Sequence, residues 1–261
     1  MKSLNEKINQ IIIESNEDVS LLFTNLKGDI FCECKKDEQV VSASTIKTPI
    51  MLAVLEEVRK GNVKLDDMIY VDEHVLLDDS KVFEDGPRLA SLYELLVWMI
   101  ILSDNTSTNV IINYFGMDRI NRYIQNVLEL KSTSVQRIML DFKAIEEGKN
   151  NYISMSDMLV MYQKLMNHEI LNDELCEVAL EILCRQRWQD DIMRYIYEPV
   201  TFAHKTGSLD YRNLDVGVMT VNHEKYFIGI SVKSVNIDGN QQLIGKLGRM
   251  IYDAIIQGDL C

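Results

Sequence analysis

Apolar and polar residues alternate along the chain with two different periods. Apolar residues recur at helical spacing over residues 4–14, and strand-like runs follow at 19–25 and 29–33 around a turn at 26–28. The middle of the chain is helical in pattern, with helices predicted at 49–60, 92–102, 109–114, 117–127, 156–166 and 173–183. Residues rich in β-formers then predict strands at 200–205, 214–221 and 226–232, before a closing helix at 241–256.

This order of elements predicts an α+β fold. The simplest assembly is an antiparallel five-stranded sheet built from both ends of the chain, flanked by helices, with an inserted all-helical lobe. We expect residues 1–42 and 190–261 to form a discontinuous α/β lobe, and residues 43–189 to form the helical lobe. A cleft between two such lobes is a usual place for an active site.

Charge and composition narrow the class of partner. The chain has 261 residues and a formal net charge of −13, which argues against a nucleic-acid partner because such proteins need a basic face. Hydrophobic residues make up 47% and charged residues 26%, an ordinary globular composition. No run approaches the roughly 20 apolar residues of a membrane span. We therefore expect a monomer that acts on a small molecule, with no nucleic-acid or membrane partner.

The N-terminal segment has no signal-peptide core. The apolar run Ile11–Ile13 is too short for one, and Glu14 follows it at once. A chain that starts at Met1 in this way is expected to be cytoplasmic, whereas removal of an export signal would make it secreted or periplasmic.

Neither the cysteines nor the histidines show a metal-binding spacing. The five cysteines are odd in number and include no C-x-x-C pair, so we expect free thiols in a reducing compartment; they are Cys32, Cys34, Cys176, Cys184 and Cys261. The four histidines are scattered. The sequence predicts no metal and no cofactor.

The first motif with candidate chemistry is Ser44-Thr45-Ile46-Lys47, at the start of a predicted helix. Residues three apart share a helix face, so Lys47 is expected beside the Ser44 hydroxyl. Desolvation in a cleft lowers the pKa of a lysine, so that its amine is neutral near pH 7. A neutral amine can take the proton of a serine nucleophile. The backbone N–H of Ser44 is a candidate oxyanion donor. Taken alone, the motif also fits a serine near a helix start and a surface lysine.

The second motif is Ser103-Asp104-Asn105, directly after the apolar run WMIIL. Ser103 is a candidate proton relay to a leaving group, and the Asn105 amide can hold a substrate amide. Alone, the same residues fit a helix-ending Asx turn.

The third motif is Lys205-Thr206-Gly207, at the end of a predicted strand. Alternation puts Lys205 and Gly207 on one face, and Gly207 would let a substrate lie against the strand. Lys205 can hold a carboxylate, and the amide of Ser208 is a candidate second oxyanion donor. Alone, this motif fits a strand end with a turn glycine.

Together, the order S-x-x-K, S-D-N, K-T-G resembles the class A β-lactamase and DD-peptidase superfamily of active-site serine enzymes. The resemblance covers nearly the whole chain and implies the same two-lobed fold. It implies that a β-lactam, or a D-Ala-D-Ala-like amide, acylates a serine. The roles it implies are Ser44 as nucleophile, Lys47 as base, Ser103 as proton shuttle, Asn105 as amide clamp, and Lys205 with Thr206 as holders of the substrate carboxylate.

The sequence departs from that family where the acyl-enzyme is hydrolysed. Class A enzymes carry an Arg and, two residues later, a Glu that orients the deacylating water; here an ungapped match from Arg137 puts Met139 at the Glu position. Methionine is neither acid nor base. Asp141 and Glu146 are the candidate substitute carboxylates.

A second departure concerns the arginine that class A enzymes often place on the neighbouring strand to hold the substrate carboxylate. Leu214 stands at the matching position, and Arg212 is a candidate substitute.

These observations predict a β-lactamase-like serine hydrolase that forms an acyl-enzyme at Ser44 and deacylates slowly. Two alternatives remain: a DD-peptidase-like peptidase or an esterase on the same scaffold, and a non-catalytic ligand-sensing domain.

Overall fold

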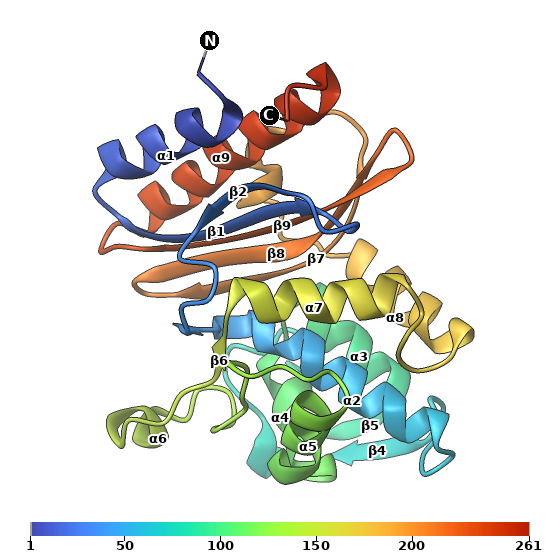
Figure 1. The fold of residues 1–261 in the computed structure, drawn as a ribbon. Helices are drawn as coiled ribbons and strands as arrows, with labels where there is room; N and C mark the ends of the chain where they lie inside the picture. Colours follow the sequence, from blue (N-terminus) through green and yellow to red (C-terminus); the bar gives the residue numbers. More distant parts are fainter. Residues whose placement is uncertain (1, 261) are drawn as a thin grey trace.

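The structure is a computed structural model that describes residues 2–260. Met1 and the thiol of Cys261, which entered the predictions of location and redox state, lie outside the described residues. The chain forms a sheet layer with two long helices on its outer face and a mainly helical layer against its other face (Figure 1). Cys32, Cys34, Cys176 and Cys184 are free thiols.

The main sheet has five antiparallel strands in the order β2-β1-β9-β8-β7, and this confirms the predicted sheet. Both ends of the chain contribute, because β1 pairs with β9 and with β2. The strands are β1 (Asp18–Asn25), β2 (Ile30–Cys34), β7 (Thr201–Leu209), β8 (Arg212–Val221) and β9 (Glu224–Lys233). Strand β7 is the last in this order, so one of its edges is open to the rest of the molecule.

Helices α1 (Leu4–Ser15) and α9 (Ile237–Gln257) cover the outer face of this sheet (Figure 1). Ser3 and Glu6 form a capping box that fixes the start of α1, and Leu4, Ile8 and Ile12 are buried along one stripe of it. Asn236 caps α9, so this helix begins at Ile237, four residues before its predicted start. The buried stripe of α1 belongs to a hydrophobic cluster that also includes residues of α9 and of the sheet.

The segment between β2 and β7 is mainly helical, but the prediction of an all-helical lobe was too simple. It contains two small antiparallel sheets, in which β3 pairs with β6 and β4 pairs with β5. The strands are β3 (Val40–Val41), β6 (Tyr152–Ile153), β4 (Met68–Val71) and β5 (Arg88–Ser91). Strands of two or four residues are too short to show a periodic pattern in the sequence. The helices are α2 (Lys47–Arg59), α3 (Leu92–Ile101), α4 (Asn105–Phe115), α5 (Met117–Asn126), α6 (Phe142–Glu146), α7 (Met155–Met166) and α8 (Asp173–Cys184), with short 3-10 turns at η1 (Ala43–Ile46), η2 (Glu73–Val75) and η3 (Ile192–Tyr195).

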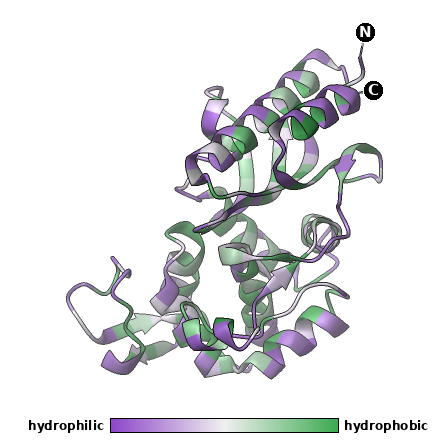
Figure 2. Cartoon of the chain, turned by 90° about the vertical axis from the view of Figure 1, so that its left-hand side faces the viewer, coloured by the Kyte–Doolittle hydropathy of each residue, from purple (hydrophilic) through white to green (hydrophobic). Residues whose placement is uncertain are grey.

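Helix α2 lies at the centre of this helical layer and is buried on every side over Lys47–Glu57. Pro49 falls in its first turn, where a missing N–H breaks no helical hydrogen bond. Figure 2 shows the hydrophobic segments turned toward the interior of both layers, with hydrophilic segments on the outer turns. Because α2 is packed into the hydrophobic core, it holds in place the turn η1 (Ala43–Ile46) at its N-terminal end. This turn lies beside the edge strand β7.

No helix of residues 2–260 combines the length and the apolar character needed to cross a membrane.

Candidate active site

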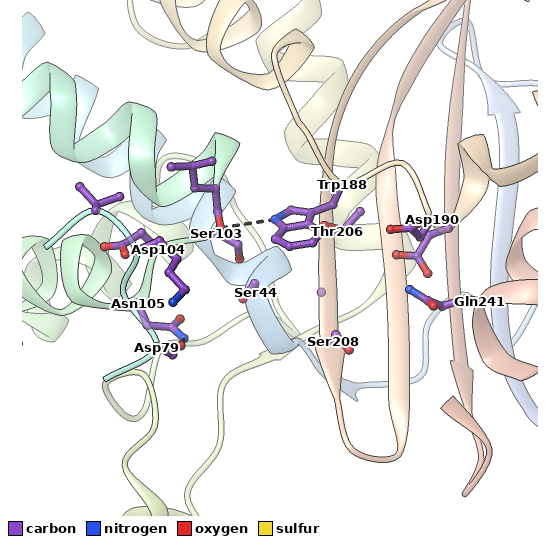
Figure 3. A pocket seen from close by; sticks show the side chains of 15 residues that line it. Ser44, Asp79, Ser103, Asp104, Asn105, Trp188, Asp190, Thr206, Ser208 and Gln241 are labelled. Atoms are coloured by element: carbon purple, nitrogen blue, oxygen red, sulfur yellow. Dashed lines mark hydrogen bonds between the residues drawn. The ribbon is translucent and has the colours of Figure 1, made fainter. Parts of the chain in front are cut away.

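A cleft of about 560 Å³ opens between the helical layer and the edge of β7 (Figure 3). All three sequence motifs reach it. Its lining residues are Ser44, Asp79, Lys81, Val82, Leu102, Ser103, Asp104, Asn105, Trp188, Asp190, Asp191, Thr206, Gly207, Ser208 and Gln241.

Ser44 lies in the 3-10 turn η1, directly before α2, and not in the α-helix itself. Ala43 enters this turn with a left-handed φ of 46°, a conformation that non-glycine residues adopt rarely. The hydroxyl of Thr45 donates to the carbonyl of Ser42 at 2.6 Å and tightens the turn. The serine is therefore held in a constrained turn at the wall of the cleft.

Lys47 is fully buried behind Ser44 and contacts the second motif. Its Nζ donates to the backbone carbonyl of Ser103 at 2.7 Å and to Oδ1 of Asn105 at 2.8 Å, and lies 3.2 Å from Oγ of Ser103. None of the hydrogen bonds found within residues 2–260 joins Lys47 to Ser44, and the place of Lys47 beside the Ser44 hydroxyl stays a prediction. Burial, aided by the charge of Lys205, lowers the pKa of Lys47 well below its usual value.

The contacts of Lys47 can be met by an ammonium, which has three N–H groups, and also by the neutral amine that its lowered pKa favours. Two of its three partners are carbonyl oxygens, which only accept, and a neutral amine has two N–H groups to give them. In the neutral form the lone pair of Nζ would face Ser103 Oγ, which lies 3.2 Å away. An amine in this state can accept a proton from a serine.

Ser103 and Asn105 are positioned by Asp104. Ser103 has a left-handed φ of 57°, and Asp104 caps α4 by accepting from the N–H of Ser107 at 2.6 Å. This cap starts α4 at Asn105, four residues earlier than predicted. The Asn105 amide nitrogen donates to Asp79 Oδ2 at 2.7 Å, so the side chain bridges Lys47 and the cleft wall.

Strand β7 passes so close to η1 that a Cβ at position 207 would crowd that turn. A Cβ there would lie 3.0 Å from Ala43 Cβ, Ser42 O and Ser44 N. This approach places the strand edge against the serine, as the K-T-G motif predicts. Thr206 and Ser208 also line the cleft; the oxyanion roles assigned to the Ser44 and Ser208 amides stay predictions.

Lys205 is buried and its Nζ donates to the carbonyl of Thr206 at 2.8 Å. Desolvation lowers its pKa to about 7, although Asp215 and Asp191 oppose the shift. Near neutral pH this lysine therefore exists in both charged and neutral forms.

Behind the strand lies a buried histidine–aspartate contact. His204 Nδ1 and Asp215 Oδ1 are 2.7 Å apart, and Phe202 stacks on the imidazole with ring centroids 4.1 Å apart. The side chain of His204 is buried among these groups, as expected for a structural residue. Burial, together with the nearby Asp215 and Asp190, raises the pKa of Asp191 well above its usual value.

Arg212, which was predicted to bind substrate, is not among the described residues that line the cleft. Its Nη1 donates to Ser231 Oγ at 2.7 Å, and its Nη2 lies 3.6 Å from Asp18. These partners belong to β9 and β1, so the guanidinium is turned across the sheet and away from β7. Leu214, at the matching family position, is fully buried.

Asp141 and Glu146, the candidate deacylation carboxylates, lie away from the cleft. Asp141 caps α6 by accepting from the N–H of Ala144 at 3.0 Å, and Glu146 is exposed at the end of this helix. Helix α6 projects away from the body of the molecule (Figure 1). Among the described residues that line the cleft, neither carboxylate is present.

Sequence reasoning missed one end of the cleft. Trp188, Asp190, Asp191 and Gln241 come from the loop before η3 and from the first turns of α9, and no local pattern marks them as neighbours of Thr206. Figure 3 shows Asp190 and Gln241 beyond Thr206, on the far side of β7 from Ser44, and Trp188 between Ser103 and Thr206.

A buried lysine, a serine in a tight turn and an open strand edge define an active-site serine hydrolase. The chain belongs to the Beta-lactamase enzyme family, whose model matches residues 3–255. It is a β-lactamase-like serine hydrolase.

Known relatives agree with this assignment. The chain is 24% identical over 279 residues to a β-lactamase of Bacteroides uniformis, a match that covers 98% of this chain and 92% of that protein. Its fold is similar to the crystal structure of a β-lactamase from Sphaerobacter thermophilus, with a TM-score of 0.87, 24% identity and 96% of each chain covered. It is also similar to a mutant of PBP-A solved as an acyl-enzyme complex with penicillin G, with a TM-score of 0.86, 25% identity, and 97% of this chain and 96% of that chain covered.

Proposed function

We propose that β-lactams or related amides and esters acylate Ser44, and that the acyl-enzyme is released slowly. The observation that carries this proposal is the buried Lys47, whose pKa is lowered by burial and whose Nζ donates to Ser103 O and Asn105 Oδ1 of the second motif. The acyl-enzyme of the structurally similar PBP-A mutant supports the same chemistry on this fold.

In the acylation step, the Ser44 hydroxyl oxygen attacks the substrate carbonyl carbon and its proton passes to the neutral amine of Lys47. The bond from the carbonyl carbon to the leaving nitrogen or oxygen then breaks. The leaving atom receives a proton through Ser103, which lies 3.2 Å from Lys47 Nζ. Backbone N–H groups at the strand edge and in η1 are the candidate donors to the oxyanion.

Slow release follows from the loop between Arg137 and Asn150. Met139 occupies the position that the family resemblance assigns to the deacylating Glu, and its side chain is buried in the core of the helical layer. Asp141 and Glu146 lie outside the cleft. Loss of a general base typically slows such a step by about 10²–10⁴-fold.

The test is a time course of intact mass after mixing the protein with penicillin G. We expect an adduct of the mass of the drug that forms in the parent and persists, and that is missing in Ser44→Ala. Rapid multiple turnover of the drug with no accumulating adduct would contradict slow release. Failure of every active-site serine probe to label Ser44 would favour a non-catalytic domain.

The carboxylates of Asp190 and Asp191 favour a second candidate, a peptidase or esterase whose substrate lacks the β-lactam carboxylate. A screen of esters for turnover that depends on Ser44 separates the two candidates. The monomeric state and the cellular location stay predictions.

A further inference from the structure

The end of the cleft beyond Thr206 is rich in carboxylates and short of cations. Asp190 is exposed there, Asp191 lies beside it, and Gln241 adds an amide from α9 (Figure 3). Among the described residues that line the cleft, none is an arginine. Lys81 is its only lining cation within residues 2–260, and that ammonium is 2.9 Å from Glu84.

Asp191 gives a second, independent sign of a ligand. Its side chain is 4% exposed, it lines the cleft, and its Oδ1 has no hydrogen-bond partner within the described part of the chain. A buried carboxylate oxygen without a partner is strongly unfavourable, because burial removes its water and nothing replaces it. Lys205 and Arg194 act on Asp191 through their charges, but neither donates a hydrogen bond to this oxygen. A positively charged group that enters the cleft and carries a donor or a close positive charge would fill that place.

No guanidinium among the described residues of the cleft makes this end attractive to an anion. Leu214 is apolar and fully buried, and Arg212 is turned toward Ser231 and Asp18. Lys205 lies nearby but is fully buried, with its Nζ directed at the Thr206 carbonyl.

Trp188 adds an aromatic ring to this end of the cleft. Its indole is half exposed in the cleft wall and is held by an Nε1–H bond to the Leu102 carbonyl at 3.3 Å. An aromatic ring combined with carboxylates is the usual composition of sites for organic cations.

We propose that Trp188, Asp190, Asp191 and Gln241 form a subsite for a positively charged group on the leaving side of the substrate. The proposal rests on the proposed function, because it takes Ser44 as the acylated residue and Thr206 as the neighbour of the leaving side. Substrates with a cationic leaving group should acylate Ser44 faster than neutral or anionic ones.

The experiment compares three phenylacetyl thioesters that share one acyl group. The leaving thiols are thiocholine, its neutral carbon isostere 3,3-dimethylbutane-1-thiol, and 3-mercaptopropionate. Thiol release is followed together with the intact mass of the acyl-enzyme, which is the same for all three. We expect the thiocholine ester to acylate at least fivefold faster than the neutral ester, and the anionic ester to be slowest, with the differences shrinking as salt is added.

Asp190→Asn is the main variant, because this exposed side chain can lose its charge without disturbing the core. It should reduce the cationic preference, measured as the ratio of the acylation rates of the thiocholine and neutral esters, at least threefold. Glu147→Gln, an exposed carboxylate on the loop after α6, is the matched control and should leave the preference unchanged.

The outcomes separate the two proposals. Acylation of Ser44 by all three esters at similar rates, or a preference unchanged in Asp190→Asn, would overturn the cationic subsite and leave the serine hydrolase intact. If neither the thioesters nor penicillin G labels Ser44, the proposed function fails and the subsite proposal fails with it.

Discussion

Asn109 holds the backbone of Met139 on both sides: its Nδ2 donates to the Met139 carbonyl at 3.1 Å, and its Oδ1 accepts from the Met139 N–H at 2.6 Å. Asn109 lies on α4, one turn after Asn105 of the cleft. The backbone of position 139 is thus tied to the helix that carries part of the site.

Met139→Glu should shorten the life of the acyl-enzyme. A carboxylate at this position could orient water toward the ester, and general-base assistance is worth about 10²–10⁴-fold. We expect the decay of the penicillin adduct, followed by intact mass, to speed up at least about tenfold.

Met139→Gln is the matched control for that experiment, because it has nearly the same shape as Glu but cannot act as a base. Its adduct should decay at the rate of the parent. Equal decay rates for the Glu and Gln variants would remove the assignment of position 139 as the site of the missing base.

A second prediction uses the left-handed φ of 57° at Ser103. Ser103→Ala and Ser103→Gly both remove the hydroxyl and should slow acylation by about 10²-fold or more, as expected for a lost proton relay. Glycine tolerates this φ, whereas alanine keeps the strain, so the Gly variant should be more stable by about 1 kcal/mol. Stopped-flow acylation and urea unfolding measure the two effects separately. Parent-like acylation in both variants would exclude Ser103 as the proton shuttle.

The sequence predicted the parts of this molecule that local patterns encode. The helix over residues 4–14, the five main strands and the three motifs follow from periodicity and residue chemistry, and the structure has these elements. The four strands of the two small sheets were missed because pairs of two and four residues show no period.

Side-chain direction was harder to predict than secondary structure. Arg212 was placed near the substrate from its position in the chain, but Asp18 and Ser231 on other strands attract its guanidinium. Trp188 and Gln241 both line the cleft because η3 packs on α9. These two segments are far apart in the sequence, so no single stretch of sequence encodes their contact.

A third prediction concerns Gly207. Replacement by alanine puts a Cβ 3.0 Å from atoms of Ser42, Ala43 and Ser44, so either β7 or η1 must shift by a few tenths of an ångström. Because the reacting groups must be aligned closely, we expect acylation to fall about tenfold to 10²-fold. Circular dichroism and the unfolding midpoint show whether the fold is kept. Acylation at the parent rate in a folded Gly207→Ala would show that the contact between β7 and η1 does not position the serine.

The last prediction is a pH dependence of stability caused by Lys205. Burial lowers its folded-state pKa to about 7, whereas a lysine in the unfolded chain keeps a pKa of about 10.4. Between these values the unfolded state binds more protons than the folded state, so the free energy of unfolding contributed by this residue rises with pH, by up to about 1.4 kcal/mol per unit. Below pH 7 both states are protonated and the burial of a charge is fully unfavourable.

Lys205→Met lacks this titration but retains Lys47 and Asp191. Urea unfolding of both proteins at pH 6, 7, 8 and 9 should therefore show Lys205→Met gaining stability relative to the parent most strongly at pH 6, with the advantage shrinking steadily above pH 7. A difference that stays constant from pH 6 to 9 would mean that Lys205 keeps its proton throughout, and its charge would then be available to a substrate carboxylate over the whole range.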